Sequence, residues 1–234
     1  MNITLYKNID KLQDRLIPCY IIHYTKNVDR LNFLKKQIFP TLIESSLFSE
    51  ITLITEFDKQ NKFIKSISKN SLLTRAEISC TKKHFSAWEQ FYKTEKNYCL
   101  ILEDDILFEE RIESSMEEQI KELSLLFSKI KKSYNYITIG AGLHKHGDKG
   151  KDFTPRKYGR SPDSYIISRE FLNYHKENLF NNDLPIGFYI DKILSENGDF
   201  LWWYEPTIFR QGTHNNIYKS NISRFYRLKK FFNL

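Results

Sequence analysis

The most restrictive feature of the chain is the segment 100–105, which reads Leu-Ile-Leu-Glu-Asp-Asp. The apolar half predicts a buried strand. Three adjacent carboxylates repel one another and favour water, so they must lie where the strand leaves the core, and open α/β sheets bind ligands at that edge. A divalent cation holding a diphosphate would neutralise them, because hard ions prefer oxygen ligands. The segment therefore suggests an enzyme with a nucleotide-activated substrate; the alternative is a strand that runs into an acidic, solvated turn.

The bulk composition predicts one folded domain. The chain has 234 residues, of which 41% are hydrophobic and 15% aromatic, which is enough to bury a sizeable core. No apolar run reaches the length of a transmembrane helix, and the first residues lack the pattern of a signal peptide. Cys19, Cys80 and Cys99 have no CxxC spacing, which indicates buried thiols in a reducing compartment. We therefore expect a cytoplasmic protein.

The charge is uneven along the chain. Lys and Arg number 36 against 29 Asp and Glu, giving a net charge of +7, and a basic surface attracts phosphates of any kind. Residues 219–234 contain five cations and no acid, with aromatic residues between them: Lys219, Arg224, Arg227, Lys229 and Lys230. We divide the chain into a catalytic domain, 1–218, and a basic aromatic tail, 219–234. The tail could lie on the anionic inner face of the cytoplasmic membrane, or it could be a packed closing helix.

Predicted strands and helices alternate along the chain. Strands are expected at 17–24, 50–55, 98–103, 134–140, 163–168 and 200–204. Helices are expected from Asp29 to a stop at Pro40, from a capping box at Thr74 and Glu77 to about residue 96, and at 112–130, 169–179 and 185–196. Residues 58–71 are expected to be a loop with some local structure, and residues 141–160 a mobile loop at the active site. This order predicts an α/β fold with a mainly parallel central sheet and helices on both faces.

Several motifs together resemble glycosyltransferase family 25, the bacterial lipooligosaccharide galactosyltransferases and their relatives. The first is the early strand Ile21-Ile-His-Tyr24 followed by Asp29-Arg30. The second is Leu73-Thr-Arg-Ala-Glu-Ile-Ser-Cys80 followed by His84 and Trp88, and the third is the acidic segment itself. The remaining matches are Asp163 to Ser168, Asp191, Tyr204-Glu-Pro206 and Gln211. The similarity covers roughly residues 17–222. Ser79 and Lys83 depart from the family pattern, which leaves the donor sugar open.

The resemblance implies a nucleotide-diphospho-sugar transferase fold of the GT-A type. It also implies a metal site for Mn²⁺ or Mg²⁺ at Glu103-Asp104-Asp105. Alternate residues of a strand point to the same side, so we expect Glu103 and Asp105 to be ligands. Asp104 then contacts the donor ribose or a backbone amide. Related folds often add a late histidine to the metal, and His214 is the candidate here.

Other residues receive roles from the resemblance or from their chemistry. Asp191 is the expected general base, which takes the acceptor hydroxyl proton, and Asp163 is the reserve. Arg30, Arg75 and Gln211 are expected donor-binding residues, because guanidinium groups can fork onto anionic oxygens. Three further sets have open roles. Arg160 is a possible phosphate or acceptor contact; Glu77 and His84 are mainly structural; Trp202, Trp203 and Tyr204 form either a sugar-stacking face or core.

The expected function is inverting, metal-dependent transfer of a hexose, with galactose from UDP-galactose as the first choice. The expected acceptor is a saccharide, free or lipid-linked, of lipooligosaccharide or capsule. One alternative is a metal-dependent nucleotidyl or phosphoryl hydrolase that uses the same acids. A less favoured alternative is a basic nucleic-acid-binding module, because outside the tail the cations are scattered rather than gathered in a stripe. We therefore expect no nucleic-acid partner.

Overall fold

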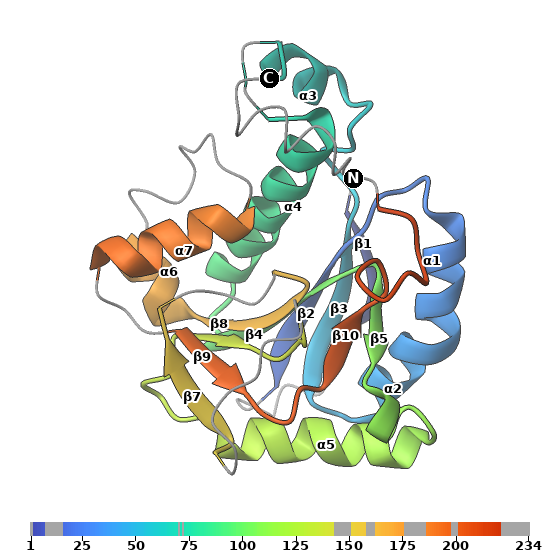
Figure 1. Ribbon diagram of the computed structural model, residues 1–234, viewed down its shortest axis with the longest axis vertical. Helices are drawn as coiled ribbons and strands as arrows, with labels where there is room; N and C mark the ends of the chain where they lie inside the picture. Colours follow the sequence, from blue (N-terminus) through green and yellow to red (C-terminus); the bar gives the residue numbers. More distant parts are fainter. Residues whose placement is uncertain are drawn as a thin grey trace.

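The computed structural model describes residues 2–7, 16–69, 71, 73–142, 151–157, 162–175, 186–197 and 201–220. Its centre is an eight-stranded sheet (Figure 1). In spatial order the strands are β1 (Ile3–Lys7), β3 (Phe48–Ile54), β2 (Ile17–Ile22), β4 (Tyr98–Glu103), β8 (Ser164–Ser168), β6 (Tyr136–Thr138), β9 (Leu201–Tyr204) and β7 (Phe153–Arg156).

The sheet is mixed. Strands β3, β2 and β4 are parallel neighbours, as are β6 and β9. By contrast, β1, β8 and β7 run antiparallel to the strands beside them. Since β8 separates β4 from β6, the strands β2, β3, β4, β6 and β9 all point the same way. The expected α/β fold with a mainly parallel sheet is therefore confirmed, with three strands reversed.

Helices cover both faces of this sheet (Figure 1). One face carries α1 (Val28–Phe33), a π-helical segment (Leu34–Ile38), α2 (Phe39–Glu44) and α5 (Met116–Lys129). The other carries α4 (Arg75–Tyr92), α6 (Arg169–His175) and α7 (Ile186–Asn197). The short helix α3 (Lys62–Ile67) precedes α4, and a 3₁₀ turn (Glu110–Ile112) precedes α5. Within the described residues, no helix combines the length and apolar character needed to cross a bilayer.

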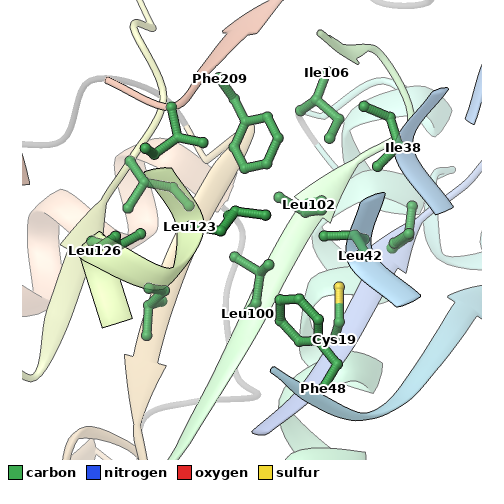
Figure 2. Close-up of a cluster of buried hydrophobic side chains, with 14 of the residues drawn as sticks. Cys19, Ile38, Leu42, Phe48, Leu100, Leu102, Ile106, Leu123, Leu126 and Phe209 are labelled. Carbon is green, nitrogen blue, oxygen red and sulfur yellow. The ribbon is translucent and has the colours of Figure 1, made fainter. Parts of the chain in front are cut away.

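Strand β4 is buried on both faces, which explains its continuous apolar sequence. Leu100 and Leu102 point into the core on the α5 side, whereas Cys99 and Ile101 point into the core beneath α4. Figure 2 shows the α5-side core, where the two leucines lie among side chains from the helices and from a distant strand: Ile38, Leu42, Leu123, Leu126 and Phe209. Burial of this kind contributes about 1.5–3 kcal/mol for each large side chain. It fixes the point at which the acidic residues leave the sheet.

The first helix differs from the sequence prediction. The sequence places its end at Pro40, but the helical path continues through Pro40 to Glu44. Proline lacks an amide hydrogen and is tolerated only in the first turn of a helix. The π-helical segment changes the hydrogen-bond spacing directly before α2, so Pro40 occupies a first turn.

Four short strands are not predicted by the sequence pattern. They are β1, β5 (Ile106–Phe108), β7 and β10 (Phe209–Gln211). The expectation of a loop over 141–160 is wrong at 153–156, because β7 pairs with β9 in the large sheet; residues 143–150 and 158–160 lie outside the described residues. Strands β5 and β10 form a separate antiparallel pair, with Gln211 opposite Ile106. The chain therefore leaves the large sheet after Glu103, turns at Asp104 and Asp105, and enters the small sheet at once. The tail beyond Ser220 lies outside the described residues.

Candidate active site at the carboxyl end of β4

The candidate site lies at the carboxyl ends of β2 and β4, which are parallel neighbours with Ile22 opposite Glu103. Three segments meet there: the loop from β2 to α1, the turn after β4, and the segment that follows β10. The amide of Gly212 donates to the carbonyl of Asp105 at 2.6 Å, joining the last two. A Cβ atom at Gly212 would lie 2.9 Å from that carbonyl and 2.5 Å from the ring of Tyr218, so this close approach requires glycine.

Asp104 is held by four donors from the loop after β2 and from α1. His23 Nδ1 and Arg30 Nη1 lie 2.9 Å and 2.6 Å from its carboxylate oxygens. The Tyr24 amide and the Asn27 side chain donate at 3.1 Å and 3.2 Å. Burial raises the pKa of this carboxyl, but His23 and Arg30 outweigh burial and lower the pKa below its ordinary value. The contact with the Tyr24 amide is the kind of backbone-amide contact expected for Asp104. Asp104 also fixes the position of Arg30.

Asp105 has the opposite environment. It is 2% exposed, and burial, followed by the neighbouring charge of Glu103, raises its pKa to about 6. Thr213 donates to Oδ2, and Arg30 Nη1 lies 3.8 Å from the same oxygen. The other oxygen, Oδ1, is buried without a hydrogen-bond partner. A second positive charge here would satisfy that oxygen and relieve the repulsion between the two carboxylates.

Glu103 is held from the α4 side and from β10. His84 Nε2 lies 3.3 Å from its Oε1, and the thiol of Cys80 lies 3.6 Å from the same atom. On the other side, the amide nitrogen of Gln211 donates to Oε2 at 3.2 Å. The amide oxygen of Gln211 is buried without a hydrogen-bond partner, as is Asp105 Oδ1.

The donor atoms in this region suit a hard divalent cation. Asp105 Oδ1 and Gln211 Oε1 are unsatisfied oxygens, and Glu103 supplies a second carboxylate. Oxygen ligands of this kind are those that Mg²⁺ and Mn²⁺ prefer. The residues therefore fit the metal that the sequence implies. Within this set, Asp105 offers a carboxylate oxygen, Oδ1, that has no hydrogen-bond partner.

His214 is not in contact with these carboxylates in the described structure. Its Nδ1 lies 3.2 Å from the carbonyl of Gly142, to which a protonated Nδ1 can donate. That hydrogen bond leaves Nε2 with a free lone pair, the arrangement typical of metal-binding histidines. The preceding residue, Thr213, contacts Asp105. Among the described His, Cys, Asp and Glu residues, the three whose ligand atoms lie within 4.8 Å of one another are Cys80, His84 and Glu103, a set that excludes His214.

Arg30 links the site to the segment that follows β10. Its Nη2 donates to the carbonyl of Lys219 at 2.8 Å, and its guanidinium lies 5.1 Å from the centre of the Tyr218 ring. The same nitrogen lies 3.5 Å from the Thr213 hydroxyl. Residues 212–220 therefore lie over Asp104 and Asp105. We refer to them below as the covering segment.

Two other expected site residues, Arg75 and Asp163, have described surroundings. Arg75 is exposed at the start of α4, with Nε 3.4 Å from the Ser68 hydroxyl. Asp163 is fully buried; its carbonyl accepts from the Glu103 amide at 2.7 Å, and its carboxylate accepts from Ser164 at 2.9 Å. Arg160 lies outside the described residues.

The expected base, Asp191, belongs to α7. This helix packs against α4, where the rings of Phe85 and Tyr189 are 5.4 Å apart. The structure does not describe the Asp191 side chain. The aromatic residues of β9 belong to the hydrophobic core. Trp203 and Tyr204 are buried on opposite faces of the sheet, and the ring centres of Trp202 and Tyr134 are 4.3 Å apart.

Sequence reasoning gave no role to His23 or Thr213, which contact Asp104 and Asp105. His23 directly follows the first strand, and parallel pairing brings that position beside the end of β4. Thr213 carries no comparable signal, because its position depends on the pairing of β10 with β5.

The chain was compared with curated protein sequences, with solved structures and with family models. No curated protein sequence matches the chain. A crystal structure of a glycosyltransferase involved in glycosylation of the PBCV-1 major capsid is similar at 11% identity, with a TM-score of 0.48, covering 94% of this chain and all of that one. A mutant Drosophila β-1,4-galactosyltransferase 7, in complex with manganese, UDP-galactose and xylobiose, is similar at 11% identity, with a TM-score of 0.45 and coverage of 91% and 79%.

The comparison with family models gives a match. The model described as glycosyltransferase family 25 (LPS biosynthesis protein) matches residues 16–185, which include β2, α4, β4 and β8. The match contains the Asp104–Arg30 pair, the capping box of α4 and both carboxylates of the candidate site. It agrees with the family that the motifs resemble. The chain belongs to glycosyltransferase family 25.

Proposed function

We propose that the chain is an inverting, metal-dependent glycosyltransferase that transfers a hexose from a UDP-linked donor to a saccharide of lipooligosaccharide or capsule. The observation that carries the proposal is the carboxylate of Asp105. It is buried beside Glu103, has a raised pKa and keeps Oδ1 without a partner. A buried polar atom without a partner is destabilising, so its presence at the edge of the sheet favours a ligand there.

In this proposal Asp105 and Glu103 hold Mn²⁺ or Mg²⁺, and His214 is a third candidate ligand. The cation, when bound, neutralises the diphosphate and stabilises the departing nucleotide. Arg30 is held by Asp104 next to Asp105 and supplies a fixed positive charge. The covering segment excludes water from the carboxylates and carries His214, and Gln211 directly precedes it at the end of β10. Arg75, at the start of α4, remains a proposed donor contact.

Asp191 is the proposed general base. Inverting transfer needs a group that takes the acceptor hydroxyl proton while that oxygen attacks the anomeric carbon, and a carboxylate is suited to this. Asp163 is less suitable, because its side chain is fully buried and accepts from Ser164. Asp191→Asn should therefore depress turnover and leave nucleotide affinity nearly unchanged. Unchanged turnover in this variant would exclude Asp191 as the base.

Galactose is the proposed sugar, and a lipid-linked saccharide at the anionic inner face of the membrane is the proposed acceptor. The support is the match to a lipopolysaccharide-biosynthesis family and the basic tail. A few hydrogen bonds in the pocket decide between sugar epimers, so the donor needs a direct measurement.

A donor screen tests the proposed function. Release of free nucleotide is followed for a panel of UDP-, GDP- and CMP-sugars with Mn²⁺, with and without oligosaccharide acceptors, and the anomeric configuration of the product is read by NMR. The expected result is acceptor-dependent release from UDP-galactose with inversion. Fast release without acceptor would instead indicate a hydrolase, and equal activity in EDTA would exclude the metal.

A further inference from the structure

A line of buried hydrogen bonds runs from α4 and β8 to the candidate metal site. The indole nitrogen of Trp88 donates to the Tyr165 hydroxyl at 2.9 Å. The same hydroxyl lies 2.8 Å from His84 Nδ1, and His84 Nε2 lies 3.3 Å from Oε1 of Glu103. Trp88, Tyr165 and His84 are each 0% exposed. The proposed roles of Asp105, Glu103 and Asp191 do not require this line of residues.

The chemistry of the four groups gives the line a direction. The Trp88 indole can only donate, so the Tyr165 oxygen accepts from it. The Glu103 carboxylate can only accept, so His84 must present a protonated Nε2 to it. A neutral imidazole with a protonated Nε2 has a bare Nδ1, and this nitrogen accepts the hydroxyl proton of Tyr165. Each of the three protons in the line then points to one acceptor.

Cys80, His84 and Glu103 have ligand atoms within 4.8 Å of one another. The donor and acceptor roles assigned above nevertheless argue against a metal ion bound by these three residues. A nitrogen that binds a metal must offer a lone pair. Here Nε2 carries its proton toward Glu103. The Cys80 thiol also lies within donating distance of Glu103, and burial and the Glu103 charge raise the pKa of this thiol well above its ordinary value. Two donors therefore meet the same oxygen of Glu103.

We propose that Tyr165 and Trp88 are positioning residues for the metal site, acting through His84 to hold the Glu103 carboxylate directed toward Asp105 and Gln211. The inference rests on the proposed metal-dependent function. Buried groups that orient a metal ligand commonly change metal affinity by about 10–100-fold when removed. The three side chains are therefore assigned a functional role that core packing alone would not require.

The first test removes one hydroxyl group from the line. Tyr165→Phe should weaken Mn²⁺ binding, measured by calorimetry in the presence of UDP, by about tenfold or more. Tyr20→Phe is the matched control, because Tyr20 is equally buried in the same core and its hydroxyl makes one hydrogen bond, at 3.0 Å, to Glu50. Tyr165→Phe should lose more stability than Tyr20→Phe, because its hydroxyl has two buried partners, and only Tyr165→Phe should lose Mn²⁺ affinity. Equal Mn²⁺ affinity in the two variants would overturn the proposal.

The second test does not depend on a metal or on activity. The ¹⁵N chemical shifts of the imidazole distinguish a bare nitrogen from a protonated one, and the His84 signals are identified by their loss in His84→Gln. The expected spectrum has Nε2 protonated and Nδ1 bare in the wild type, and a mixed tautomer in Tyr165→Phe. A bare Nε2 in the wild type, or stoichiometric zinc in elemental analysis of the purified protein, would overturn the proposal.

Rescue separates positioning from packing. His84→Gln retains an N–H donor that can reach Glu103, whereas His84→Leu keeps similar volume without a donor. The glutamine variant should retain more Mn²⁺ affinity than the leucine variant; equal loss in both would reduce His84 to a packing residue. If the wild-type protein binds no Mn²⁺ while its tautomer is as expected, the proposed metal dependence fails and the hydrogen-bond line remains.

Discussion

At the residue scale, Asp104 and Asp105 are neighbours in the sequence with different electrostatic environments. Asp104 is paired with Arg30 and His23, and these contacts lower its pKa. Asp105 is buried beside Glu103, and burial and that charge raise its pKa. Asp104 is therefore part of the structural support of the site, and Asp105 is the residue with unsatisfied binding capacity.

The same substitution at the two positions should have different effects on stability. Asp104→Asn should lower the free energy of unfolding by about 3 kcal/mol, because it leaves the buried Arg30 without its counter-charge. Asp105→Asn should leave it unchanged or raise it, because a neutral amide removes the repulsion with Glu103. Urea unfolding without metal measures both, and comparable destabilisation would contradict this assignment.

Nucleotide binding should distinguish the two variants in a second way. Asp105→Asn should abolish Mn²⁺-dependent UDP binding while its circular dichroism spectrum stays that of the wild type, since the proposed metal loses its surest ligand. Retained Mn²⁺-dependent binding in this variant would remove Asp105 from the metal site.

The identities of the acidic residues could be predicted from sequence, but their partners could not. An apolar run that ends in three acids indicates a strand with carboxylates at its edge. The pairing of Asp104 with His23 depends on the register between β2 and β4, which are 81 residues apart at this contact. Short sequence motifs carry no information about such a register.

At the element scale, helix α4 carries His84 and Cys80 to Glu103, and its start is fixed by a capping box. The Thr74 hydroxyl accepts from the Glu77 amide at 3.2 Å, and the Glu77 side chain accepts from the Thr74 amide at 2.8 Å. This cap was predictable, because both of its members are local in sequence.

Removal of the cap should destabilise the protein measurably. Thr74→Ala should lower the free energy of unfolding by about 1–2 kcal/mol. Ser115→Ala on α5 is the control: its side chain accepts one bond from Glu118, at 3.1 Å, and no reciprocal pair is formed. It should cost about 0.5–1 kcal/mol. A larger loss at Ser115 than at Thr74, measured by urea unfolding, would argue against the reciprocal cap.

The covering segment depends on Gly212. Gly212→Ala would place a Cβ atom 2.5 Å from the Tyr218 ring, so the segment should loosen and hydrogen exchange in 212–220 should become faster. Gly187→Ala is the control, because there the added Cβ meets only ordinary contacts, the nearest at 3.5 Å from Pro162. Unchanged exchange in Gly212→Ala would show that the ring moves aside without releasing the segment.

The long elements could be predicted from sequence, and the short ones could not. Helices α4 and α5 and the strand β4 have clear periodicity or burial patterns. Strands β5 and β10 have three residues each and exist because they pair with each other across about 100 residues of chain. Pro40 indicates a helix end locally, but the π-helical segment before it allows the helix to continue.

At the scale of the whole molecule, the site and the tail meet through Arg30. The Arg30 guanidinium binds both the Asp104 carboxylate and the carbonyl of Lys219, the first residue of the basic tail. The tail therefore begins next to the proposed donor site.

The point of contact also determines where the chain should be cut to test the tail. Truncation after Ser220 keeps the bond from Arg30 to Lys219 and removes four cations: Arg224, Arg227, Lys229 and Lys230. Each basic residue near an anionic bilayer contributes about 1 kcal/mol of binding. The truncated chain should therefore bind phosphatidylserine vesicles much more weakly, with Mn²⁺-dependent UDP affinity unchanged.

A full-length variant with these four residues changed to glutamine separates charge from aromatic insertion. If attraction between charges dominates, this variant should lose vesicle binding to nearly the same extent as the truncated chain. Binding of the wild type should then fall with added salt, because the Debye length shortens. Equal partitioning of wild-type and truncated chains would exclude a membrane role for the tail. Lost UDP binding on truncation would instead place residues beyond Ser220 in the active site.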